Sequence, residues 1–528
     1  MTALAAVALA PAVPTVPPAV AGYAAAALLA VGWNIAYAGR IAQLRRAPRA
    51  LAFLSGVCGL LIAPSYLAHI AGSTLYGGRA VNSVSWLWPL AALLVLAQAA
   101  YAAGRRLVTP LVGVPLVAYD LLVALVALAR FLVERGVDPP AFLLALSAAQ
   151  ATVLGPVLGE AALVSPLAVL VPLLVPAYPA RWRLTRGTRA LISTAAAFVT
   201  ALTVLELPRA SAVVAGYAPY RLERLSERPA GDLAVGLVVL TRLAGPPPAL
   251  AVRNDGPLLD SVDLDAVHVR LRPGGLALAA LDSLAAVLDQ ARRDSTLLVV
   301  SLDYEPGDAA RRRADPEGFD ARRLALVERA ARALRPDVLL PAGAPYGEAA
   351  ADVGRLAPAE WERYLAAAAA RAHAVNRRIR VGVAAGDYSP EDSLVWAWAG
   401  SRRAPLDAVG FTVRPSFSGA AGVDARLRAA ERWARAAEQA RDAPVRPKEQ
   451  WVFEVEGFPV VHGPESQEGV VWHTIAWASA RPEVAGVIVG EPGDYGEMTG
   501  LRGANGALRP AVGAVQRALR GLREGVAP

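Results

Sequence analysis

The sequence contains one cysteine, Cys58, and one lysine, Lys448, among its 528 residues. A single cysteine excludes a framework of disulfides within the chain. Histidine is also scarce, and His373, His462 and His473 lack the spacing that metal-binding histidines show. No glycine-rich phosphate loop stands between a predicted strand and a predicted helix. The sequence therefore predicts neither a metal site nor a bound cofactor.

Most of the chain carries no net positive charge. Residues 1–206 hold 13 arginines and 5 acidic residues, so this part carries the whole net charge of +8 and the remainder is neutral. The basic part is also the apolar part, which favours signals of membrane topology over a surface for nucleic acid. We therefore expect the lipid bilayer to be a partner of the chain, and nucleic acid not to be one.

Long apolar stretches fill the first part of the chain. A bilayer is crossed by about 20 apolar residues, and such stretches occur at 19–39, 50–71, 84–104, 107–133, 189–207 and, interrupted by proline, at 140–179. We predict an all-α bundle of transmembrane helices over residues 1–207, followed by a linker over 208–230.

Arginine clusters set the predicted orientation, because such clusters tend to stay in the cytoplasm. They follow the first and third stretches and precede the last one. If all are cytoplasmic, residues 140–179 make one crossing, six spans result, and the C-terminal domain lies outside the cytoplasm. If these residues cross twice, seven spans place that domain in the cytoplasm. The charges favour six spans, in the cell membrane.

Residues 231–528 alternate short β-rich runs with helical patterns, as parallel βα units do. Eight strands are predicted, at 233–241, 266–271, 296–304, 337–343, 379–386, 408–413, 450–457 and 484–491. Helices are predicted at 277–294, 321–335, 358–378, 424–442, 468–480 and 510–523. Eight strands in about 290 residues predict an α/β TIM barrel, the (β/α)₈ fold.

Catalytic groups of such barrels lie at the C-terminal ends of the strands. Strands alternate their side chains between two faces, and polar residues share one face near several of these ends. They are His268, Arg270, Ser301, Asp303, Glu305, Thr412, Arg414, Glu454 and Glu456. We predict that they face a polar cup, with the arginines pairing the carboxylates, and that Trp451, Phe453 and Val455 pack outward against helices.

Three passages resemble the clan of retaining glycoside hydrolases that includes cellulases, β-galactosidases and β-glucanases. They are "VEGFP" at the end of the seventh strand, "DAVHVRLRPGG" around the second, and the closing segment from "AGVIVGEPGDYGEMTGL" to the last helix. The resemblance covers roughly residues 231–523. It implies that Glu456 is the nucleophile and that Arg270 supports it.

The fourth strand departs from the pattern of that clan. Ala344 and Pro345 stand where the clan has its acid/base glutamate, and neither can transfer a proton. Candidate replacements are Glu305, which is favoured because its parity is inward, Glu348, and Asp494 or Glu491 after the eighth strand. Retaining hydrolysis would need the two carboxyl groups about 5 Å apart.

Aromatic residues that follow strand ends could stack on sugars. They are Tyr304, Tyr346, Tyr388, Phe417, Phe458 and Tyr495. Together with Arg270, Asp303, Arg414, Glu454 and Asp494, they are the candidates for binding a carbohydrate.

The leading hypothesis is a membrane-anchored, glycoside-hydrolase-like protein that acts on or binds an extracytoplasmic polysaccharide or glycoconjugate. The alternative is a pseudoenzyme, a barrel without catalysis that serves as a carbohydrate-binding or assembly ectodomain. A third hypothesis, transport by the spans, has no motif to support it.

Overall fold

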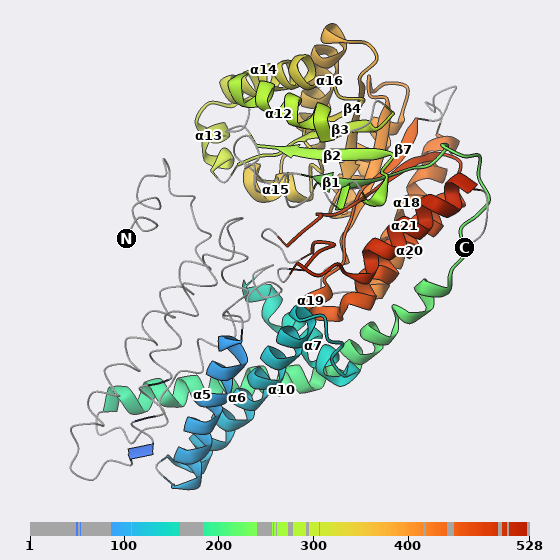
Figure 1. Cartoon of the computed structure of the whole chain (residues 1–528). Coiled ribbons are helices and arrows are strands. Elements are labelled where there is room, and N and C mark those ends of the chain that lie inside the picture. Colours follow the sequence, from blue (N-terminus) through green and yellow to red (C-terminus); the bar gives the residue numbers. More distant parts are fainter. Residues whose placement is uncertain are drawn as a thin grey trace.

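The computed structural model describes residues 86–158, 183–239, 261–272, 278–291, 295–415, 419–440, 448–494, 499–503 and 506–524, except 107 and 306, with a few isolated positions. The predicted spans at 19–39 and 50–71 and much of 140–179 lie outside the described residues. Figure 1 shows a helical domain beside a barrel domain.

Four long helices make up the described part of the helical domain. They are α5 (Leu87–Gly104), α6 (Pro110–Glu134), α7 (Ala141–Leu158) and α10 (Arg183–Ala215). Their sequences are rich in alanine, leucine and valine, and α6 begins at a proline, which suits the first turn of a helix. The side chains between α5, α6, α7 and α10 form an apolar core of their own.

Two helical segments of the described chain are long and apolar enough to cross a membrane, Pro110–Val133 and Ala190–Leu222. Two apolar helices are shorter, Pro89–Gly104 and Ala141–Gly155. These four segments coincide with predicted apolar stretches. The predicted bundle of six spans is a larger claim, which remains a prediction.

The stretch predicted as a linker has structure of its own. Helix α10 continues through Pro208 to Ala215, and the 3₁₀ helix η2 (Ala218–Leu222) follows. The hydroxyl of Tyr220 donates a hydrogen bond of 2.9 Å to the carbonyl oxygen of Ala420. Residues 217–220 thus pack against the barrel before its first strand begins.

Eight parallel strands close into a barrel in sequence order (Figure 1). They are β1 (Ala234–Val239), β2 (Ala266–Leu271), β3 (Leu297–Leu302), β4 (Val338–Leu340), β5 (Arg380–Ala385), β6 (Ala408–Val413), β7 (Glu449–Val455) and β8 (Val484–Val489). This ring, with helices around it, confirms the predicted barrel.

Ten helices accompany these strands in the described part of the barrel domain. They are α12 (Leu278–Ala291), α13 (Asp308–Ala314), α14 (Pro316–Leu334), α15 (Glu348–Val353), α16 (Pro358–Val375), α17 (Pro390–Gly400), α18 (Gly419–Gln439), α19 (Pro459–His462), α20 (Pro464–Ser479) and α21 (Pro510–Glu524). Several begin at proline after a capping residue. Asp315 accepts a hydrogen bond from the backbone N–H of Gly318, for example, and so starts α14.

Side-chain parity on β2, β3 and β6 is as predicted. Val267, Val269 and Leu271 of β2 join the large core between strands and helices, whereas His268 and Arg270 face the inside. The same alternation places Ser301 and Thr412 inside the barrel.

The parity predicted for Trp451 and Phe453 is wrong, because β7 contains an irregularity. Phe411 of β6 pairs with Val452 and the next residue pairs with Glu454, so Phe453 is an extra residue in β7. Such a β-bulge lets two neighbouring side chains leave the strand on the same side. Trp451 and Phe453 pack inside the barrel, in a small cluster separate from the outer core.

Two glycines make room for these rings inside the barrel. A Cβ atom at Gly410 of β6 would lie 2.4 Å from Cδ2 of Phe453, and one at Gly486 of β8 would lie 2.2 Å from Cζ3 of Trp451. Only glycine permits so close an approach. The two rings fill the barrel below the level at which the carboxylates of β7 stand.

The end of β7 also contacts the helical domain. Phe458 and Val461 lie in one buried apolar cluster with Ala145, Ala148 and Ala149 of α7, and Ala210 of α10 belongs to it. The loops at the C-terminal end of the barrel therefore face the helices (Figure 1).

Candidate functional site: a cup of carboxylates and arginines

A cavity of about 500 Å³ lies at the C-terminal end of the barrel. Its walls come from all strands between β2 and β7, and its charged lining residues are Arg270, Arg272, Asp303, Glu348, Asp352, Asp387, Arg414, Arg426 and Glu454. This charged cup is where the sequence predicted one, because polar residues end β2, β3, β6 and β7.

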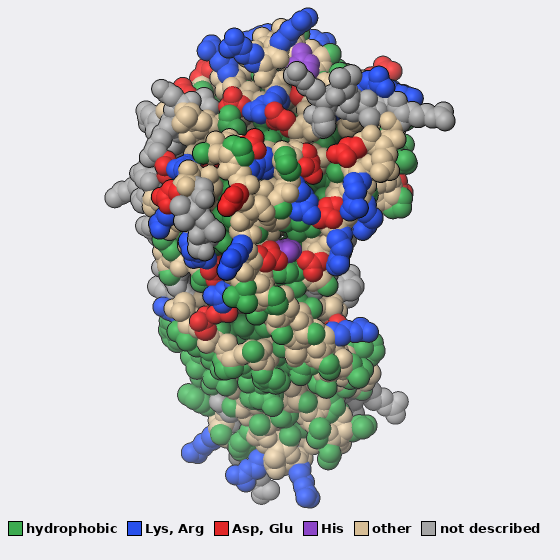
Figure 2. All heavy atoms as spheres, turned by 90° about the vertical axis from the view of Figure 1, so that its right-hand side faces the viewer, with side chains coloured by type: hydrophobic (Ala, Val, Ile, Leu, Met, Phe, Trp, Pro, Cys, Tyr) green, Lys and Arg blue, Asp and Glu red, His purple; other side chains and the backbone are tan. Residues whose placement is uncertain are grey.

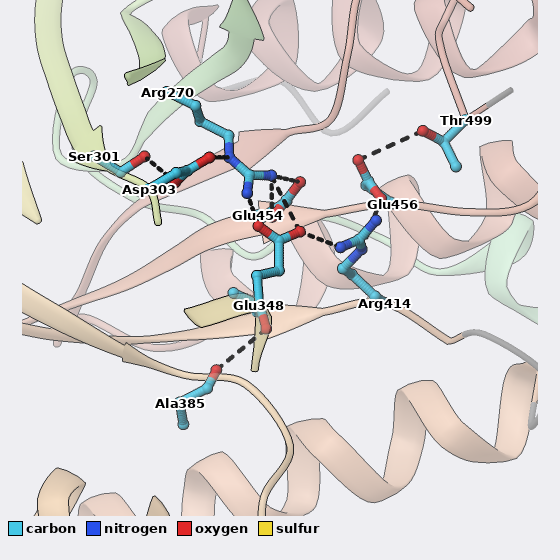
Figure 3. Close-up of polar contacts among 10 residues, drawn as sticks. Arg270, Ser301, Asp303, Glu348, Ala385, Arg414, Glu454, Glu456 and Thr499 are labelled. Atoms are coloured by element: carbon cyan, nitrogen blue, oxygen red, sulfur yellow. Dashed lines mark hydrogen bonds and ion pairs between the residues drawn. The ribbon is translucent and has the colours of Figure 1, made fainter. Parts of the chain in front are cut away.

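Arg270 is the centre of the cup (Figure 3). Its Nε lies 3.1 Å from Oδ2 of Asp303, and its Nη1 lies 3.3 Å from Oε1 of Glu454. The same Nη1 donates to Oε1 of Glu348 at 3.2 Å, and Nη2 also pairs with Glu348. The side chain of Arg270 is only 6% exposed. Three carboxylates, from the residue after β3, from β7 and from α15, thus converge on one guanidinium.

Arg414 follows β6 and pairs with two carboxylates, Glu348 and Glu456. Its Nη1 contacts Glu348, and its Nε lies 2.8 Å from Oε2 of Glu456 (Figure 3). Glu348 is therefore shared between Arg270 and Arg414. The resemblance implied that Arg270 supports Glu456, but Arg270 contacts Glu454, and Arg414 contacts Glu456.

The pKa values of Glu454 on β7 and of Glu456 just after this strand are shifted in opposite directions. Burial raises the pKa of Glu456, and the charges of Glu454 and Glu491 raise it further, so that Arg414 does not restore it to its usual range. Burial also acts on Glu454, but the guanidiniums of Arg270 and Arg414 outweigh it and lower the pKa of this carboxyl. The lowered pKa keeps Glu454 ionised at neutral pH, whereas the raised pKa of Glu456 favours its protonated form.

Glu456 lies behind the cup. Its side chain is 1% exposed and it is absent from the cavity lining. Its neighbours include Arg414, Glu454, Glu491 and the hydroxyl of Thr499, which lies 3.5 Å from Oε1. A Cβ atom at Gly490 would lie 2.6 Å from Cγ of Glu456, so the next strand closes over it.

Of the candidates for the missing acid, Glu348 reaches the cup and Glu305 does not line it. Glu348 is the first residue of α15, and its carboxylate lies among the guanidiniums of the cup. The carboxylate of Glu305 pairs with Arg311 at 3.1 Å. Glu491 is buried next to Glu456, outside the lining.

The fourth strand has no carboxylate at its end. Ala344 lines the cup there, and the adjoining loop is tight, because a Cβ atom at Gly386 would lie 2.5 Å from the Cα of Gly347. This close approach brings the turn that ends at Glu348 against the end of β5.

Asp494 has a structural partner. Its Oδ2 lies 2.6 Å from Nη2 of Arg509, and both side chains are buried. Its Oδ1 accepts from the backbone N–H of Gly500. This pair fixes the loop after β8 and does not line the cup.

The candidate stacking residues take different places. Tyr304 touches the cup but packs in the core, edge-on to Trp361 and beneath the guanidinium of Arg323. Tyr346 is buried and donates to the carbonyl of Leu356. Phe458 lines the cup. Phe417 and Tyr495 lie outside the described residues.

His268 was predicted to face the cup and lines it, whereas Arg272 and Arg426 are among the lining residues that were not predicted. His268 has its pKa lowered to about 4, first by burial and then by Arg270, so its ring is neutral. Arg272 continues the inward parity of Arg270, which could have identified it. Arg426 lies on α18 and carries no signal in the sequence. Within the described ranges, no group of three or more His, Cys, Asp or Glu residues is arranged to hold a metal ion.

No family model matches the sequence, and no curated protein matches it. Solved structures show similarity to about half of the chain. One is a GH5_18 protein from Streptomyces cattleya in complex with Manb1-4GlcNAc, 18% identical, with a TM-score of 0.43 over 55% of this chain and 81% of that one. A GH113 β-1,4-mannanase is 9% identical, with a TM-score of 0.38 over 55% of this chain and 98% of its own. Thermotoga maritima Cel5A with mannotriose is 12% identical, with a TM-score of 0.39 over 54% and 98%.

Proposed function

We propose that the barrel is a glycoside-hydrolase-like domain that acts on or binds a polysaccharide or glycoconjugate outside the cytoplasm, and that the helical domain anchors it in the membrane. The observation that carries the proposal is the meeting of Glu454 and Glu348 at Nη1 of Arg270. Nη1 of Arg270 lies within hydrogen-bond distance of Oε1 of Glu348 and of Oε1 of Glu454. These two oxygen atoms are therefore no farther apart than the sum of the two hydrogen-bond lengths. Hydrolysis of a glycosidic bond with retention requires two carboxyl groups at about this separation.

The structure favours a different assignment of roles from the one that the resemblance implied. Glu454 is ionised, lines the cup and is supported by Arg270, as a nucleophile should be. Glu348 comes from the neighbourhood of β4 and would be the acid/base, which must lose its pairing with one guanidinium when substrate enters. Glu456, enclosed behind the cup, would hold Arg414 in place.

A second candidate function is binding without turnover. Two observations favour it, namely that Ala344 occupies the place of the acid and that Glu348 is held by both Arg270 and Arg414. A carboxylate so paired favours its ionised form, which cannot donate a proton. In this reading the cup recognises a glycan and the barrel is a receptor or assembly module.

The proposal of membrane anchoring rests on the surface of the helical domain. Large apolar side chains are exposed there, including Leu111 (85%), Leu205 (74%) and Leu191 (71%). Figure 2 shows hydrophobic side chains covering this domain on one face, whereas charged side chains cover the barrel. Exposed apolar area of this extent supports contact with lipid.

A panel of polysaccharides tests the function, with release of reducing ends and calorimetric binding measured on the full chain in detergent. If the domain is a hydrolase, Glu454→Gln and Glu348→Gln abolish or reduce turnover, the latter by on the order of 10²–10⁴-fold, and leave binding measurable. Binding without turnover in the unchanged protein selects the second candidate. Glu317→Gln, an exposed position on α14, is the matched control, and absence of both binding and turnover rejects the proposal.

A further inference from the structure

Two cations of the cup have no acidic partner in the described part of the chain. Arg270 and Arg414 each pair with two or more carboxylates, as described above. For Arg272 and Arg426, in contrast, no carboxylate of the described residues lies within ion-pair distance, although both line the cavity. The Nε of Arg272 is buried and finds no acceptor in the same part of the chain. A buried donor without an acceptor is costly unless a ligand supplies one.

The two arginines stand on opposite sides of the cup. Arg272 comes one residue after the end of β2, and Arg426 lies on α18, which follows β6. In the closed ring β2 and β6 are separated by three strands in either direction. A ligand that reached both side chains would therefore extend across the mouth of the barrel, above Glu454.

Arg426 is held in its place. Its guanidinium lies 5.7 Å from the ring centre of Tyr388, and that ring packs against Trp433 and Phe411. The hydroxyl of Tyr388 donates to the carbonyl of Thr412 at 2.8 Å. The side chain is thus preorganised and half-buried, which reduces the entropy lost when it binds a ligand.

The charge of Arg426 is unfavourable in the free protein. Burial lowers its pKa, and the positive charge of Arg414 lowers it further against the opposing effect of Tyr388. Of the carboxylates that line the cup, Asp303, Glu348 and Glu454 pair with Arg270 or Arg414, and Asp387 pairs with Arg355. An anionic group of a ligand would balance the charges of Arg272 and Arg426 directly.

We propose that the ligand of the cup is an anionic saccharide, whose acidic groups bind Arg272 on one side of the mouth and Arg426 on the other. Guanidinium groups bind carboxylates, sulfate esters and phosphate esters through the same paired hydrogen bonds. This inference rests on the proposed function for the claim that the ligand is a saccharide. The new claim is that this saccharide is negatively charged.

Calorimetry on the full chain in detergent tests the inference with three oligosaccharides of equal length: an oligogalacturonate, a sulfated oligosaccharide and a neutral oligoglucoside. We expect an acidic oligosaccharide to bind at least about tenfold more tightly than the neutral one and to weaken as salt increases. Arg272→Gln and Arg426→Gln each weaken the acidic ligand by about tenfold to a hundredfold and leave the neutral one unchanged. Arg432→Gln, an exposed arginine on the same helix α18, has no effect. Whether the uronate or the sulfated ligand responds identifies the acidic group.

Failure of this inference differs from failure of the proposed function. If the neutral oligosaccharide binds as tightly as the acidic ones, or if both arginine variants bind acidic ligands normally, the saccharide function stands and the inference is overturned. If none of the three binds, both are overturned. Circular dichroism of the variants confirms that a loss of binding does not come from unfolding.

Discussion

Phe453 and Glu454 are adjacent in β7, and both side chains point into the barrel. The bulge at Phe453 makes this possible, since an ideal strand would send one of them outward. The ring of Phe453 fills the barrel next to Gly410, and Glu454 reaches Arg270 one level above. The geometry of the cup therefore depends on a local irregularity of one strand.

The space at Gly410 should be essential to that irregularity. In Gly410→Ala the new Cβ would lie 2.4 Å from the ring of Phe453 and 2.5 Å from the carbonyl oxygen of Trp451. We expect the free energy of unfolding of the barrel to fall by about 1–3 kcal/mol, and ligand binding to weaken because Glu454 moves. Chemical denaturation followed by tryptophan fluorescence measures the first effect.

Gly400→Ala is the control, because its Cβ would meet only ordinary contacts, 3.7 Å from the Cβ of Ala437. Equal stability of the two variants would show that the rings inside the barrel can move aside.

Removing the charge of Glu454 should destabilise the barrel. Glu454→Gln keeps the shape of the side chain but leaves Arg270 with one fewer anionic partner. We expect a loss of about 1–3 kcal/mol in the free energy of unfolding at neutral pH, compared with less than about 0.5 kcal/mol for the exposed Glu317→Gln. The difference should shrink in acid, because the lowered pKa of Glu454 means that its contribution disappears as it becomes protonated. If Glu454→Gln were as stable as the parent, Asp303 and Glu348 alone would be enough to compensate the charge of Arg270.

Glu456 should give the barrel a stability that falls as pH rises. Its pKa is raised in the folded chain, so from about pH 4.5, the ordinary value, up to the raised pKa the folded state binds more protons than the unfolded one. Stability from this group is therefore present in acid and is lost with increasing pH. In Glu456→Gln we expect a flatter dependence and, at alkaline pH, a more stable protein than the parent. The free energy of unfolding measured between about pH 5 and pH 9 checks this, and parallel curves would contradict it.

The fold was accessible from the sequence because its signals are local. The strands at 266–271 and 408–413 were predicted at their observed bounds, and parity placed Arg270, Asp303 and Arg414 correctly. Local parity could not show the bulge at Phe453, because the room for its ring comes from Gly410 and Gly486 on other strands. The pairing of Arg270 with Glu348, and the position of Arg426, depend on how α15 and α18 pack, which a periodic pattern does not encode.

Phe458 should be needed by both domains. Phe458→Ala removes a ring that is buried against α7, and we expect the free energy of unfolding to fall by about 3–5 kcal/mol, together with faster proteolysis between residues 208 and 230. Val461→Ala, in the same apolar cluster but outside the lining of the cup, is the comparison. It should loosen the contact between the domains without changing ligand affinity, whereas Phe458→Ala should change both. If Phe458→Ala bound the ligand with unchanged affinity, the ring of Phe458 would not contribute to ligand binding.

Phe458 lines the cup and also packs against α7, so it links the barrel domain to the helical domain. A ligand that displaced this ring would alter its contact with α7, and a shift of α7 that moved the ring would alter the affinity of the cup by the same free energy. The same ring is thus a wall of the cup and part of the packing against the helices, so a change in its position alters both.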